Sequence, residues 1–206
     1  MFPQPPPEIA EARWPKFRPA HEVRDWAYEQ FINECAPLLN EDHKHLRLAR
    51  VLFVWSSECF NRQGKVVVGT AQQGKQRPSG PGVKSYMEDR YREWNDPKFG
   101  QLPEFIITLC WPYLREADPV SVCALLQHEL YHCGQKKDEF GFPEYTKRGL
   151  PKYAMRGHDV EEFTRIVELY GSTSPELTRM AAAIQVGPKE RLSAIKGAVC
   201  GCGARV

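Results

Sequence analysis

The chain has 206 residues, which is long enough for one domain with a sizeable hydrophobic core. Its formal net charge of +2 is too small to indicate a nucleic-acid partner by itself. No stretch approaches the roughly 18 apolar residues of a membrane span, and the first residues lack the basic flank and apolar run of a signal peptide. The seven cysteines are odd in number and irregularly spaced, which argues against a disulfide framework and favours a reducing compartment. These features predict a cytoplasmic protein without a membrane partner.

The first segment, residues 1–20, contains six prolines. This composition is typical of an extended chain rather than of a packed helix or sheet. We therefore expect a Pro-rich lead-in that lies over the domain through Trp14 and Phe17.

Residues 21–35 place apolar side chains close to helical spacing, which predicts an amphipathic helix. The sequence EDHKH follows, with His43 and His45 two positions apart among polar residues. We expect these histidines in a surface loop, and a metal-binding role is the alternative.

Three short runs rich in β-branched and aromatic residues predict strands at residues 51–55, 66–70 and 105–109. A polar connection separates the first two runs, so we expect a hairpin or two adjacent strands. Residues 71–103 lack a clear period and are expected to form a long insertion loop.

The 71–103 segment mixes basic with aromatic residues, a pattern that can bind single-stranded nucleic acid. Its acidic residues dilute that charge, so nucleic acid is a weaker candidate partner than protein. The other interpretation is a helix near residues 85–94, packed through Tyr86, Tyr91 and Trp94.

The stretch DPVSVCALLQHELYHC predicts a helix from Asp118 to Cys133. Asp118 is a favourable N-cap, Pro119 suits the first helical position, and Gly134 is placed to end the helix. Apolar residues surround much of the circumference, which is typical of a buried helix.

This helix contains the motif HExxH, formed by His128, Glu129 and His132. Residues four apart share one face of a helix, so both imidazoles can bind one metal ion, and zinc suits such ligands. Glu129 lies beside them and would take a proton from a metal-bound water as general base. The alternative is an ordinary amphipathic helix whose histidines face solvent or a polar core pocket.

A third metal ligand is expected at the start of a helix that follows residue 156. His158 is the only histidine after His132 and is the favoured candidate. Asp159, Glu161 and Glu162 are the other candidates, and one of these carboxylates could instead accept the second ring N–H of a ligand histidine.

Residues 172–206 are expected to form a helical extension. Ser174 and Pro175 are signals for the start of one helix, and an apolar stripe near residues 192–199 indicates a second, shorter one. The end carries a CxC pair, Cys200 and Cys202, which offers too few ligands for a structural zinc site.

The order of these motifs resembles the phage metallopeptidase family and is similar, more distantly, to SprT-like and minigluzincin proteases. The likeness covers residues 47–171 and is most specific at HELYH and GHDVEEF. It implies an α+β, zincin-like domain over residues 21–171, with a small mixed or antiparallel sheet packed on the HExxH helix and with additional C-terminal helices. It also implies Zn²⁺ held by His128, His132 and His158, Glu129 as catalytic base, and action in a bacterial host's cytoplasm.

Two functions follow from this sequence. The first is a zinc metallopeptidase that acts on a protein or peptide substrate, in which residues 66–70 or residues 105–109 form an edge strand that pairs with the substrate. The second is a catalytically silent zinc-binding scaffold that binds a host protein or nucleic acid. Glu129 favours the first, because a structural site needs no acid at that position. Near the motif, Tyr145, Tyr153 and Arg156 are candidates to stabilise the transition state.

Overall fold

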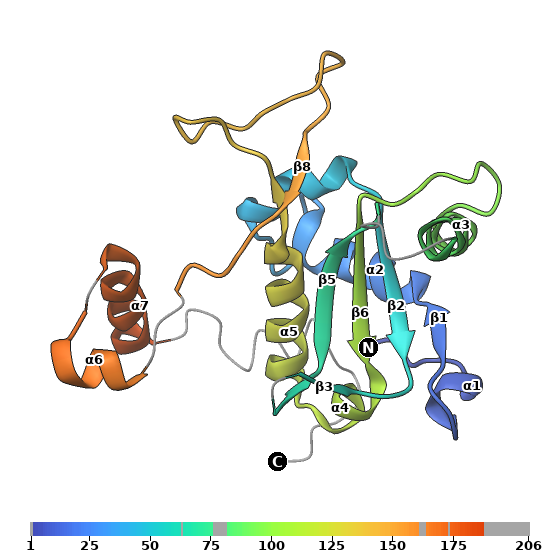
Figure 1. The fold of residues 1–206 in the computed structure, drawn as a ribbon, viewed down its shortest axis with the longest axis horizontal. Helices are drawn as coiled ribbons and strands as arrows, with labels where there is room; N and C mark the ends of the chain where they lie inside the picture. The colour runs from blue at the N-terminus through green and yellow to red at the C-terminus, as the bar shows by residue number, and fades with distance from the viewer. Residues whose placement is uncertain (1, 63, 76–81, 161–163, 173, 188–206) are drawn as a thin grey trace.

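The computed structural model describes residues 2–62, 64–75, 82–160, 164–172 and 174–187. A four-stranded mixed sheet lies at the centre (Figure 1), with the strand order β1-β2-β6-β5. β2 and β6 are parallel, and the outer pairs, β1 with β2 and β5 with β6, are antiparallel. The strands are β1 (Phe17–Pro19), β2 (Val51–Ser56), β5 (Gly69–Gln73) and β6 (Phe105–Cys110).

The two central strands are the most apolar ones, because both of their faces are covered. On one face, Val51, Phe53 and Trp55 join the main core with the helices α2 (His21–Ala27) and α5 (Pro119–His132). On the other face, a smaller cluster gathers against the helix α3 (Val83–Asn95) and consists of Leu52, Val54, Tyr91 and Ile106. This alternation follows from the two-residue period of a strand.

The expected pairing of residues 51–55 with residues 66–70 is wrong, because β6 lies between β2 and β5. The 66–70 run is also divided at Val68 between β5 and the short strand β4 (Lys65–Val67). β4 forms a hairpin with β3 (Phe60–Arg62) instead. The two strands that are buried along almost their whole length occupy the centre of the sheet, and β5, whose residues are half-buried or exposed, takes an edge.

The segment expected as a long loop contains the helix α3, which packs on the sheet opposite α5 (Figure 1). Tyr91 is buried, and Trp94 packs partly against the same cluster, as the helical interpretation predicted. Tyr86 does not take part and is 61% exposed.

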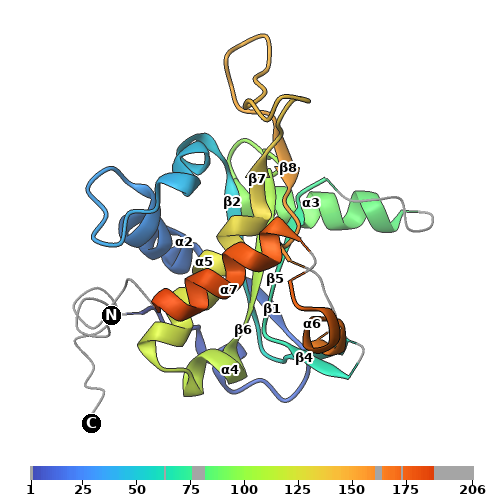
Figure 2. The ribbon, with the colours of Figure 1, turned by 90° about the vertical axis from the view of Figure 1, so that its left-hand side faces the viewer.

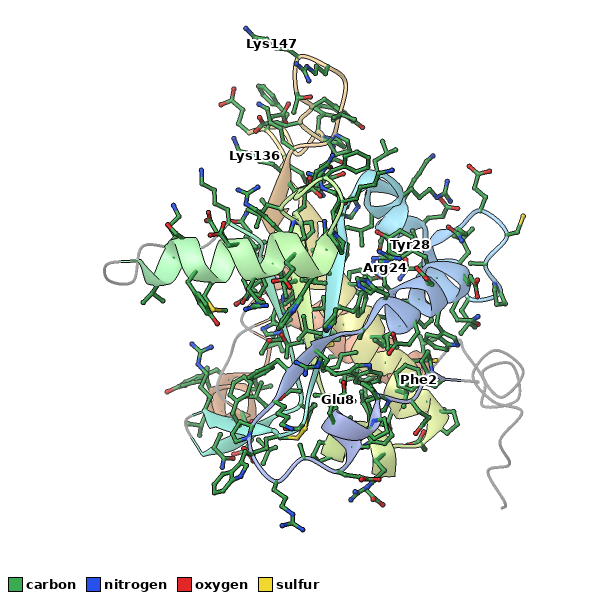
Figure 3. All side chains as sticks on the ribbon, turned by 90° about the vertical axis from the view of Figure 1, so that its right-hand side faces the viewer. Phe2, Glu8, Arg24, Tyr28, Lys136 and Lys147 are labelled. Carbon is green, nitrogen blue, oxygen red and sulfur yellow. A yellow bond between two sulfur atoms is a disulfide. The ribbon has the colours of Figure 1, made fainter. Side chains whose placement is uncertain are left out.

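The Pro-rich start is held differently from our expectation, because Trp14 is 76% and Phe17 48% exposed. Phe2 and Ile9 enter the main core instead, the latter from the short helix α1 (Pro7–Ala10). Figure 3 labels Phe2 close to the body of the domain. β1 then adds an edge strand to β2, so the lead-in is part of the fold.

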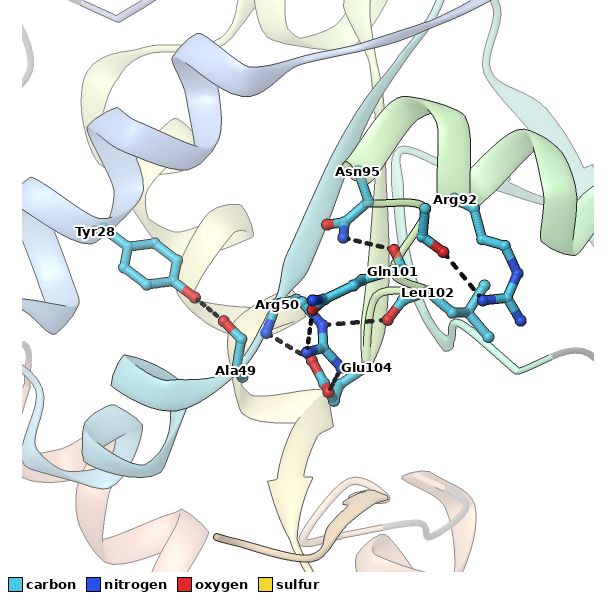
Figure 4. A network of polar contacts seen from close by, with 9 residues as sticks. Tyr28, Ala49, Arg50, Arg92, Asn95, Gln101, Leu102 and Glu104 are labelled. Carbon is cyan, nitrogen blue, oxygen red and sulfur yellow. Dashed lines mark hydrogen bonds and ion pairs between the residues drawn. The ribbon is translucent and has the colours of Figure 1, made fainter. Parts of the chain in front are cut away.

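The starts of β2 and β6 are joined by one arginine (Figure 4). Arg50 forms an ion pair with Glu104, and its backbone N–H donates to the same carboxylate over 2.7 Å. Its guanidinium also donates to the carbonyl of Leu102 over 3.2 Å and to the side chain of Gln101 over 2.8 Å. The bonds fix the register of the two central strands at one end of the sheet.

At the other end of β6, Cys110 forms a disulfide with Cys59. The irregular cysteine spacing argued against a disulfide framework, and this bond is the single disulfide among the described residues. Both residues lie close to where the chain leaves β2 and β6, so the bond ties the β3–β4 region to the sheet.

After α4 (Trp111–Glu116) and α5, the chain forms a β-hairpin from β7 (Cys133–Gln135) and β8 (Tyr153–Met155). Its long loop projects from the domain, and Figure 3 shows Lys147 near its far end. The helices α6 (Thr164–Tyr170) and α7 (Pro175–Val186) follow on the side of α5 away from β5 (Figures 1 and 2). Ser174 caps α7 as expected, by accepting from the N–H of Leu177.

Among the described residues, no helix has the length and apolar character needed to cross a bilayer. Glu161 and Glu162, the expected short helix near residues 192–199 and the CxC pair lie outside the described residues.

Candidate metal centre

The helix α5 forms where its capping signals predict it. Asp118 is the N-cap and accepts hydrogen bonds from the N–H groups of Val120 (2.8 Å) and Ser121 (3.1 Å). Pro119 is the first helical residue, and the helix ends at His132. One face enters the core through Leu126 and Leu130, which are fully buried. The burial of this face fixes which way the HExxH side chains point.

The imidazoles of His128, His132 and His158 come together at one point. The Nε2 atom of His128 lies 3.2 Å from that of His132 and 3.3 Å from that of His158. In a tetrahedral site with Zn–N bonds of about 2.05 Å, two ligand nitrogens lie roughly 3.3 Å apart. Both distances from His128 therefore fit ligands of one metal ion of this size, and the ligand atoms of all three histidines lie within 4.8 Å of one another.

The orientation of His132 is fixed by the residue that directly follows β8. Its Nδ1 atom lies 2.8 Å from the carbonyl oxygen of Arg156. A carbonyl oxygen can only accept, so Nδ1 carries a proton, and in the neutral imidazole this tautomer leaves the lone pair on Nε2. Burial, and then the charges of His132 and His158, lower the pKa of His128. Neutral imidazoles with converging lone pairs are the form that binds a metal.

The other expected candidates are placed elsewhere. Asp159 is absent from the imidazole cluster, and its carboxylate forms an ion pair with Arg156 at 2.7 Å. Tyr145 is exposed on the hairpin loop, and Tyr153 packs against Phe105 in the core. His158 itself lies in a segment that is neither helix nor strand, ahead of α6.

The expectation of a surface loop for His43 and His45 is wrong. They lie in the 3₁₀-helix η2 (Glu41–Leu48), and His43 is 1% exposed with its ring 4.7 Å from that of Tyr131. The Nε2 atom of His45 lies 2.6 Å from the carbonyl oxygen of Cys133. Both histidines contact the C-terminal end of α5, and neither belongs to the cluster of three imidazoles.

Glu129 is buried between α5 and the edge strand β5. A Cβ atom placed on Gly69 would lie 2.7 Å from Oε1 of Glu129, so a larger residue here would force the carboxylate to move. Glu129 is 4% exposed, and this burial raises its pKa to about 7, against the opposing charge of His132. A carboxyl group with such a pKa can both take up and release a proton near neutral pH.

A polar network supports the motif from η2. The hydroxyl of Tyr131, which lies between Glu129 and His132 in the motif, donates to Asp42 over 2.9 Å and accepts from Nδ2 of Asn40 over 3.0 Å. Asn40 also donates to Gln127 over 2.8 Å. The sequence analysis missed these contacts, because they join residues about 90 positions apart and no local pattern indicates them.

A pocket of about 800 Å³ lies between η2 and the hairpin loop. Tyr131 and Arg156 line it, but none of the three clustered histidines does. The imidazole cluster therefore lies outside this pocket.

The mixed sheet, the helix on its edge strand and the imidazole cluster define an α+β protein with a candidate site for one metal ion. The sequence profile of the family described as "putative phage metallopeptidase" matches residues 24–185, which is well over half of the chain. The chain belongs to this family, and the resemblance seen in the sequence is confirmed. No curated protein and no solved structure matches the chain.

Proposed function

We propose that the protein is a zinc metallopeptidase in which His128, His132 and His158 hold the ion and Glu129 is the general base. The observation that carries this proposal is the convergence of three imidazole Nε2 atoms, with spacings of 3.2 and 3.3 Å, next to a buried carboxylate. Three nitrogen ligands with room for a water are the arrangement of a catalytic zinc rather than of a structural one.

A bound zinc ion would lower the pKa of its water and polarise the scissile carbonyl. Glu129 takes the proton of the attacking water and later delivers it to the leaving amine. Burial raises the pKa of this carboxyl group, and a higher pKa makes Glu129 a stronger base toward the water. The carboxylate reaches this position from the helix that also carries His128 and His132, so the base and these two ligands keep one relative geometry.

The edge strand β5 supports the choice of a peptide substrate. The N–H of Cys110 donates to the carbonyl of Val68, and the N–H of Gly74 donates to that of Glu104. Because hydrogen-bonded and non-bonded pairs alternate in an antiparallel ladder, the backbone groups of Gly69 and Ala71 point away from β6. No other described strand pairs with that edge. An extended substrate can add there as a further strand and pass Glu129.

The test is hydrolysis of fluorescently labelled casein by the wild type and by Glu129→Gln, with zinc content measured in both. We expect Glu129→Gln to keep its zinc, because the ligands are untouched, and to lose nearly all hydrolysis. Asp138→Asn, on the projecting hairpin loop, is the matched carboxylate control and should cleave like the wild type. A Glu129→Gln protein that cleaves at the wild-type rate would refute the proposed mechanism.

A further inference from the structure

Arg156 lies where the chain comes back to the imidazole cluster after the β7–β8 hairpin. It contacts His132 directly, and it forms an ion pair with Asp159, the neighbour of His158. We infer that Arg156 is a positioning residue for the metal centre: its backbone carbonyl orients His132, and its guanidinium fixes the segment that carries His158. This inference rests on the proposed zinc site and adds residues that act on two of its ligands.

The backbone half of this arrangement continues the β7–β8 ladder. Cys133 is paired with Met155 in that ladder, so His132 and Arg156 are the next pair along it. The N–H of Arg156 donates to the carbonyl of His132 over 2.9 Å, and the carbonyl of Arg156 accepts from Nδ1 of the same histidine over 2.8 Å. The hairpin thus sets both the tautomer and the ring orientation of His132.

The side-chain half acts on His158. Residues 157–160 lie in neither helix nor strand, so no ladder or helix holds this ligand in place. The guanidinium of Arg156 forms an ion pair with Asp159 over 2.7 Å, three positions along the chain. The pair closes a short loop around His158 and limits where its imidazole can lie.

An exposed ion pair contributes little when its side chains must be ordered for it alone. Here the guanidinium carbon lies 5.2 Å from the ring centre of Tyr131, a distance that allows a cation–π contact. Tyr131 is itself held by its hydroxyl contacts with Asn40 and Asp42 in η2. Arg156 is therefore ordered before any metal binds, and it connects the loop of the third ligand to the helix of the first two.

The consequence is a preorganised site, in which less free energy is lost to ordering His158 when the metal binds. Removal of residues that orient metal ligands typically weakens metal binding by about 10- to 100-fold. The effect should appear in metal affinity itself, and not only in the rate of a reaction.

The experiment compares zinc dissociation constants, measured by competition with a chromophoric chelator, for the wild type, Arg156→Gln and Asp159→Asn. Each variant should bind zinc about tenfold more weakly or worse, and the double variant should be little weaker than either single one, because both remove the same ion pair. The visible spectrum of the cobalt(II)-substituted protein should change in both variants. Arg179→Gln breaks a similar ion pair with Glu176 on α7 and should leave zinc affinity and the cobalt spectrum unchanged.

The outcomes separate this inference from the proposed function. A wild-type chain that binds neither zinc nor cobalt overturns the proposed zinc site. A wild type that binds zinc, together with an Asp159→Asn variant of equal affinity and unchanged cobalt spectrum, overturns the side-chain role of Arg156 and leaves the proposed zinc site standing. Asp159→Asn decides even if Arg156→Gln fails to fold, because it leaves the arginine backbone and its stacking on Tyr131 in place.

Discussion

Replacement of Gly69 by alanine tests how closely the edge strand β5 and Glu129, the proposed general base, must fit together. The new Cβ would lie 2.7 Å from Oε1 of Glu129 and 3.0 Å from Cδ1 of Leu125. Ordinary contacts of a Cβ atom begin near 3.4 Å. The carboxylate must therefore move by several tenths of an ångström or more, and it can do so because it is the far end of a flexible side chain.

A shift of this size in a catalytic group can reduce a rate by about 100-fold, or roughly 2.7 kcal/mol in activation free energy. We expect Gly69→Ala to lower kcat by about that factor while the zinc content stays at the wild-type level. The loss of folding stability should stay within about 1–3 kcal/mol, the usual cost of one extra methyl in a packed site.

The assay is casein hydrolysis together with zinc analysis and thermal unfolding of the same preparations. Thr70→Ala is the control, because the alternation of the strand turns this neighbour toward the opposite face of the sheet, and it should cleave like the wild type. Full activity in a zinc-loaded Gly69→Ala protein would show that Glu129 does not act from its position beside β5.

Two further predictions concern folding. Burial lowers the pKa of His43 to about 4, whereas the unfolded ring titrates near 6.5, so the unfolded state binds more protons in this window. The free energy of unfolding should therefore fall by up to about 3 kcal/mol as the pH drops from 6.5 to 4. Urea unfolding at several pH values measures it. The His43→Leu variant should lack this part of the pH dependence, and the control variant His21→Gln should retain it. Asp118→Ala removes the cap of α5 and should cost about 1 kcal/mol in the same measurement. An unchanged urea midpoint in Asp118→Ala would contradict the stabilising role of the cap.

Local patterns in the sequence were enough to predict the helix of the site. The cap at Asp118, the proline after it and the apolar positions of α5 act within a few residues of one another, so they determine the helix whatever surrounds it. The four-residue spacing of His128 and His132 likewise fixes that both imidazoles share a face. The strands β2 and β6 were predictable as well, because β-branched and aromatic runs suit buried strands.

The tertiary structure decided everything that depends on pairs of residues far apart in the chain. The insertion of β6 between β2 and β5 separates two strands that were expected to be neighbours, and it leaves β5 at the edge, where Gly69 lies against Glu129. The strands β7 and β8 are too short to show a period in the sequence. Their pairing places Arg156 and His158 close to the C-terminal end of α5. A sequence pattern records which residues can form a helix or strand, whereas the neighbours of each side chain follow from how those elements share one core.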